Sequence, residues 1–63
     1  MKIKHHREKL KLSQEELAEK VAVDRSTIAK WETGKAMPRA DKLPELARIL
    51  ECEVSELFER NVR

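Results

Sequence analysis

Apolar residues recur at spacings of three and four along most of the chain, which is the period of amphipathic helices. The pattern predicts five helical segments, the first over residues 2–10. The fourth follows Asp41, a candidate N-cap, and the fifth covers about 54–60. Pro44 fits the first turn of the fourth segment, because the N–H that it lacks has no partner inside a helix there. The predicted inward faces of these segments hold Ile3, His6, Arg7 and Leu10, then Leu43, Leu46, Ala47 and Leu50, then Val54, Leu57 and Phe58.

Local capping signals define the second segment. Ser13 and Glu16 stand three residues apart as a capping box, in which the serine hydroxyl accepts from the backbone and the glutamate reaches back. A helix is therefore expected to begin at Gln14, and its acidic first turn suits the positive end of the helix dipole. Its inward face is predicted to hold Leu17, Ala18 and Val21.

The third segment is predicted over residues 25–33. Asp24 is a good N-cap at its start. Gly34 tolerates the left-handed backbone that often closes a helix, so it marks the end. Ile28 and Trp31 are expected to face inward, with the remaining side chains outward or lateral.

Together the second and third segments form a motif over about residues 14–33. Ala18 is small, which lets the third segment cross the second at a steep angle. Two short helices joined by a tight turn are typical of a helix-turn-helix, in which one face of the second helix is free to enter a major groove.

The composition limits the classes of function. The 63 residues are expected to form one domain, residues 1–63, with a small core and no deep catalytic cleft. The single cysteine excludes an internal disulfide and a multi-cysteine zinc site. No apolar run approaches the roughly 20 residues of a membrane span, and the N-terminus lacks the apolar region of a signal peptide. We therefore expect an all-α cytoplasmic protein that is not an enzyme and binds no cofactor or metal.

The net charge of +2 hides a pattern along the chain. Residues 1–11 carry five Lys or Arg and one Glu, and residues 25–39 carry four and one. Between them, residues 12–24 carry four acids and one Lys. Two basic blocks can gather on one face, as a phosphate-facing surface requires. Charge alone is equally compatible with a generally solvated surface.

Two stretches carry a resemblance to a known family. Residues 12–21, Leu-Ser-Gln-Glu-Glu-Leu-Ala-Glu-Lys-Val, and 25–35, Arg-Ser-Thr-Ile-Ala-Lys-Trp-Glu-Thr-Gly-Lys, resemble the Cro/Xre helix-turn-helix family. The resemblance covers about residues 3–58 and includes the later Leu-Pro-Glu-Leu-Ala and Val-Ser-Glu-Leu-Phe segments. It implies a compact five-helix, lambda-repressor-like domain that binds double-stranded DNA, encoded by a prokaryote or a phage.

The resemblance also implies roles for individual residues. The base-facing positions of the recognition helix match Arg25, Ser26, Thr27 and Lys30. The chemistry agrees, since Arg or Lys donates to guanine, Ser donates or accepts, and a Thr methyl touches the thymine methyl. Positions that bind phosphate in the family match Gln14, at a helix N-terminus, and Thr33, Lys35 and Arg39. Arg7 and Glu32 match a structural pair that joins the first helix to the third.

This sequence departs from the family at three helix ends. Relatives commonly place glycine where this chain has Lys11, Ala22 and Glu51. Such positions often need a positive φ, which costs a non-glycine residue roughly 1 kcal/mol. We expect this conformation at all three.

Other residues admit a functional and a plain structural interpretation. Trp31 can be a stacking platform for a single strand, but its spacing with Ile28 favours the core. Cys52 has no Cys-x-x-Cys partner, so a packing role is favoured over a nucleophile. His5 and His6 point apart on a helix, which favours one exposed and one half-buried histidine over a metal pair.

The leading hypothesis is a sequence-specific repressor or regulator that binds an inverted repeat as a homodimer, since one recognition helix reads few base pairs. Candidates for the dimer surface are Leu57, Phe58 and Val62, although Leu57 and Phe58 can equally close the core of the monomer. The alternative is a protein-interaction module, such as an antitoxin, built on the same fold.

Overall fold

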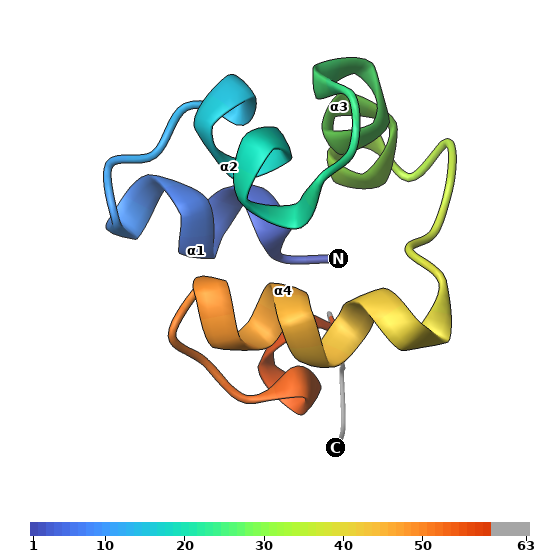
Figure 1. The fold of residues 1–63 in the computed structure, drawn as a ribbon. Coiled ribbons are helices and arrows are strands. Elements are labelled where there is room, and N and C mark those ends of the chain that lie inside the picture. Colours follow the sequence, from blue (N-terminus) through green and yellow to red (C-terminus); the bar gives the residue numbers. More distant parts are fainter. Residues whose placement is uncertain (59–63) are drawn as a thin grey trace.

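A computed structural model of the chain describes residues 1–58, and these residues form four α-helices and two short 3₁₀ helices (Figure 1). The α-helices are α1 (Ile3–Lys9), α2 (Gln14–Val21), α3 (Arg25–Thr33) and α4 (Leu43–Ile49). The 3₁₀ helices are η1 (Ala40–Lys42), which leads directly into α4, and η2 (Val54–Leu57). Figure 1 shows α2 and α3 on one side of the molecule, with α4 and η2 on the other. The expected all-α fold is confirmed.

The prediction of a fifth α-helix is wrong. The segment after α4 is the 3₁₀ helix Val54–Leu57, closed by a bond from the Phe58 N–H to the Ser55 carbonyl. Phe58 then has extended backbone, with φ −94° and ψ 141°. A 3₁₀ helix suits a segment this short, and within it only Leu57 is buried. The end of the predicted helix, beyond residue 58, lies outside the described residues.

The start of α2 agrees with its predicted capping box. The Ser13 hydroxyl oxygen accepts from the Glu16 N–H at 3.0 Å, and the Glu16 carboxylate accepts from the Ser13 N–H at 2.8 Å. Both bonds satisfy backbone donors that a helix N-terminus leaves without partners. Gln14 is therefore fixed as the first residue of α2.

The other two predicted caps are less well supported by the structure. Asp24 is the N-cap of α3 and has extended backbone, but its side chain makes no capping hydrogen bond. Asp41 does not cap α4, because the chain is already turning in η1 and Lys42 is the N-cap. Pro44 lies in the first turn of α4, as predicted.

All four α-helices end in the same way. A residue with positive φ follows each helix, and the next N–H donates to a carbonyl five residues back in the helix. This hydrogen bond satisfies a carbonyl that would otherwise lack a partner at the C-terminal end of the helix. The positive-φ residues are Lys11 (59°), Ala22 (61°), Gly34 (84°) and Glu51 (58°). The predicted positive φ at the three non-glycine positions is thus confirmed.

The core is formed by side chains from α1, α2, α3, α4 and η2. The fully buried side chains include Leu17 and Val21 from α2 and Ile28 from α3, as predicted. Trp31 is 5% exposed, so it belongs to the core and offers no stacking platform. The remaining members of the core cluster are Ile3, Ala18, Leu46, Ala47, Leu50 and Leu57.

The first and last described elements are joined by hydrogen bonds. The Lys2 N–H donates to the Leu57 carbonyl at 2.7 Å, and His6 Nε2 lies 3.1 Å from the Glu56 carbonyl oxygen. Leu57 is fully buried, so it closes the core of the monomer and is excluded as a dimer contact. Phe58 is half-buried, and Val62 lies outside the described residues. Within residues 1–58, none of the helices has the length and apolar character that crossing a bilayer requires.

Candidate nucleic-acid interface

The predicted base-reading residues lie along α3. Arg25, Ser26 and Lys30 are exposed, and Thr27 is half-buried. Ser26 and Lys30 are four residues apart, so their side chains are neighbours on one face of the helix. The opposite face is buried through Ile28 and Trp31. The structure therefore anchors α3 by one face and leaves donor and acceptor groups on the other.

An ion pair fixes α3 against α1. Arg7 Nε lies 2.7 Å from Glu32 Oε2, and a second guanidinium nitrogen lies 3.3 Å from Glu32 Oε1. The two side chains are only 9% and 4% exposed. The third guanidinium nitrogen of Arg7 donates to the Leu12 carbonyl at 2.7 Å. A forked arginine–carboxylate pair of this kind holds its partners in a defined orientation.

The same carboxylate also binds the first residue of α2. Gln14 Nε2 donates to Glu32 Oε1 at 2.9 Å. Because this amide carries two hydrogens, the second remains available to a ligand at the N-terminus of α2. Sequence reasoning identified Gln14 and Glu32 separately but missed the bond between them, since their separation of 18 positions leaves no local signal.

The remaining predicted phosphate ligands lie around the end of α3. Thr33 is exposed, but its hydroxyl donates to the Ala29 carbonyl at 3.0 Å and lies 3.3 Å from the Lys30 carbonyl. A phosphate contact by Thr33 therefore requires its hydroxyl to rotate. Lys35 and Arg39 are exposed in the loop between α3 and η1. Arg39 lies 3.8 Å from Asp41, and both are largely exposed, so this pair holds the arginine only weakly.

Two residues near this surface were not singled out from the sequence. Met37 lies between Lys35 and Arg39 and is 60% exposed, although it is large and apolar. Lys42 donates to the Val21 carbonyl at 2.9 Å and lies 3.6 Å from Glu45, so it ties the end of α2 to α4. No local sequence pattern identifies either feature, because both depend on how distant segments meet.

Within residues 1–58, no group of three or more His, Cys, Asp or Glu could hold a metal ion. His5 is exposed and His6 half-buried. Cys52 is half-buried and packs against the core. Burial, with smaller contributions from Glu56 and Glu53, raises the pKa of the Cys52 thiol. A raised pKa is the opposite of what a nucleophilic thiolate needs.

Comparison with known proteins agrees with this geometry. The chain matches a family model described as helix-turn-helix over residues 3–57. It is 42% identical over 57 residues to an uncharacterized HTH-type transcriptional regulator of Methanothermobacter thermautotrophicus, covering 89% of this chain and 83% of that protein. A similar regulator of Archaeoglobus fulgidus is 37% identical over 57 residues, covering 90% of this chain and 80% of that protein.

A longer relative shares only one region with this chain. The HTH-type transcriptional activator BcrR of Enterococcus faecalis is 38% identical over 47 residues, which cover 75% of this chain but 23% of the activator.

The matched region of the family model runs from the start of α1 to the end of η2, so it includes every element described above. The chain therefore belongs to the helix-turn-helix family, of the Cro/Xre type that its sequence resembles.

Proposed function

We propose that this chain is a sequence-specific, double-stranded DNA-binding transcription regulator in which α3 enters the major groove. The observation that carries the proposal is the exposed face of α3, where Arg25, Ser26 and Lys30 stand on a helix fixed by its buried side. These side chains supply the donors and acceptors that read base edges in a major groove. The names of these relatives, two of them regulators and one an activator, agree with this role.

Phosphate contacts would set the register of α3 on the duplex. In this proposal Gln14 at the start of α2, and Thr33, Lys35 and Arg39 at the end of α3, bind the backbone on either side of the recognition helix. Backbone contacts position a protein, whereas base contacts specify the sequence. The forked Arg7–Glu32 pair links α1, α2 and α3, so it would keep these two groups of contacts at a fixed spacing.

The protein is proposed to act in the cytoplasm as a repressor and to bind an inverted repeat as a homodimer, with the whole chain as one domain. A single recognition helix contacts few base pairs, and pairing two of them about 34 Å apart doubles the contacts. Leu57 is buried in the core and cannot contact a second copy. Phe58 is half-buried, so within residues 1–58 it is the predicted dimer contact with part of its side chain exposed.

Selection of binding sites from a random duplex pool by the purified chain tests this proposal. Enrichment of an inverted repeat with half-sites about one helical turn apart is expected. Enrichment of a single half-site would contradict the dimer but retain sequence reading. The absence of any enrichment at low salt would reject the proposed function and favour the protein-interaction module.

A further inference from the structure

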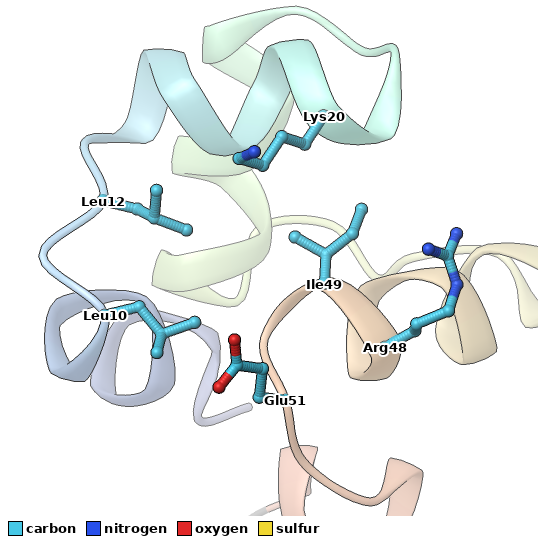
Figure 2. A pocket seen from close by; sticks show the side chains of 6 residues that line it. All are labelled: Leu10, Leu12, Lys20, Arg48, Ile49 and Glu51. Atoms are coloured by element: carbon cyan, nitrogen blue, oxygen red, sulfur yellow. The ribbon is translucent and has the colours of Figure 1, made fainter.

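On the flank of the domain, a groove lies between the end of α1, the second half of α2 and the end of α4 (Figure 2). Its volume is about 460 Å³, within the range of roughly 300–1,000 Å³ typical of ligand pockets. Six side chains line it: Leu10, Leu12, Lys20, Arg48, Ile49 and Glu51. None of them is among the residues proposed to contact DNA.

The groove combines an apolar floor with a charged rim. Leu10, Leu12 and Ile49 are each half-buried, so they present aliphatic surface to solvent at one place. Lys20 and Arg48 are exposed on opposite walls, one from α2 and one from α4. Within residues 1–58 neither of them forms an ion pair, unlike Lys42, which pairs with Glu45. Glu51 is the one acid of the lining.

Two strained turns flank this groove. Lys11 stands between Leu10 and Leu12 with φ 59°, and Glu51 follows α4 with φ 58°. These residues close α1 and α4 in the manner common to the four helices. Leu10 and Leu12 flank Lys11, and Ile49 is the last residue of α4, so the groove lies where α1 and α4 end.

We infer that this groove binds an acidic amphipathic segment of a partner protein, one that inserts aliphatic side chains between Leu10, Leu12 and Ile49 and places carboxylates beside Lys20 and Arg48. Charge complementarity selects this occupant. Nucleic acid does not fit, because a phosphate chain offers no aliphatic side chains to cover Leu10, Leu12 and Ile49.

The position of the groove has a consequence for function. On α2, the proposed DNA contact is Gln14 at the N-terminus, whereas Lys20 lies near the opposite end of the helix. α3 contributes no residue to the lining. A partner in the groove would therefore leave α3 free, so the domain can bind DNA and a protein segment together. The inference does not depend on the proposed DNA binding, since the groove exists without it.

Titration of the isotope-labelled chain with a defined peptide, followed by NMR, tests the inference without DNA. The probe is a short synthetic peptide with leucines at helical spacing and glutamates between them. One control peptide replaces its glutamates with lysines, and another replaces its leucines with serines. Saturable shifts are expected at the amides of Leu10, Leu12, Lys20 and Ile49 with the acidic peptide alone.

A pair of charge reversals supplies the matched variants. Arg48→Glu and Lys4→Glu both reverse an exposed cation of a helix, but Lys4 is not part of the groove. Arg48→Glu is expected to weaken peptide binding about tenfold at low salt and Lys4→Glu to leave it within about twofold. Thermal unfolding of both variants establishes that each is folded.

Three results would overturn the inference. The first is the absence of saturable shifts, or shifts confined to other surfaces. The second is equal binding of the lysine peptide, which would remove the charge argument. The third is a shift of the same amides with protein concentration alone, which would assign the groove to a second copy of the chain.

Discussion

Arg7 Nε lies 2.7 Å from Glu32 Oε2 and joins two helices whose residues are 25 positions apart. Both side chains are almost completely shielded from water. Among residues 1–58, every buried side-chain nitrogen and oxygen has a hydrogen-bond partner. Arg7 also holds the Leu12 carbonyl and Glu32 holds the Gln14 amide. One guanidinium and one carboxylate thus fix α1, the α1–α2 turn, α2 and α3 together.

Glu32→Gln should destabilise the protein by about 3–5 kcal/mol, because removing one partner of a buried pair leaves the other charge uncompensated. The full effect of a buried pair applies here, because the two side chains are only 9% and 4% exposed. Urea unfolding of the variant and of the native chain measures the difference. Glu45→Gln is the matched control, because its pair with Lys42 is part-exposed, and it should lose at most about 1 kcal/mol. Equal losses in both variants would contradict the structural role of the Arg7–Glu32 pair.

Ala22→Gly should leave the melting temperature unchanged or raise it. Ala22 has φ 61° at the end of α2, a conformation that costs an L-residue roughly 1 kcal/mol and glycine almost nothing. The greater backbone freedom of glycine in the unfolded chain offsets part of this gain. Thermal unfolding followed by circular dichroism gives the sign.

Gly34→Ala is the reverse substitution at the end of α3, and it is the control for Ala22→Gly. Gly34 has φ 84°, and a Cβ built there meets no atom within 4 Å, so backbone strain acts without a steric clash. This change should lower stability by about 1 kcal/mol. A lower melting temperature for Ala22→Gly would show that the turn between α2 and α3 differs from the one described.

The local part of the fold could be read from the sequence, and the non-local part could not. The capping box of Ser13 and Glu16 and the glycine after α3 act within a few residues, so the start of α2 and the end of α3 followed from them. The positive φ at Lys11, Ala22 and Glu51 followed from the resemblance, because these residues stand where relatives have glycine.

Two errors arose where a local signal competed with tertiary structure. Asp41 looked like an N-cap, but η1 brings the chain into α4 without its side chain. The spacing of Leu57 and Phe58 predicted an α-helix, but this segment is the 3₁₀ helix η2. Its position is set by the burial of Leu57 in the core and by the hydrogen bond from the Lys2 N–H to the Leu57 carbonyl. The Gln14–Glu32 bond and the groove beside α4 were invisible for the same reason, since they join segments distant in sequence.

The Cys52 thiol should react slowly with iodoacetamide at pH 8 compared with a free cysteine, because burial and the neighbouring acids raise its pKa. A group whose pKa is raised by folding stabilises the fold below its unfolded value and loses that effect as pH rises. The protein should therefore lose stability above about pH 9.0, the ordinary value for this thiol, relative to Cys52→Ser. Fast alkylation at pH 8, or parallel stability curves for both proteins, would contradict the described environment.

Lys30→Ala should weaken binding to the selected DNA site by about 1–3 kcal/mol and relax the preference at one base position, while binding to unrelated duplexes changes less. Lys30 is exposed on the outer face of α3, so its loss should not alter the fold. A titration against the selected site and its single-base variants measures both effects. An unchanged affinity together with an unchanged preferred sequence would show that α3 presents a different face to DNA.

Lys35→Ala should instead weaken binding to every duplex by a similar factor, because a phosphate contact carries no sequence information. Lys35 is exposed in the loop after α3, and its N–H remains bonded to the Lys30 carbonyl at 2.9 Å whatever the side chain. The slope of log affinity against log salt should fall by about 1, since one fewer counterion is released. Comparing this slope with that of Lys30→Ala separates a backbone contact from a base contact. If Lys35→Ala changed the preferred sequence and left the salt slope intact, the two roles would have to be exchanged, and the loop, not the middle of α3, would read the bases.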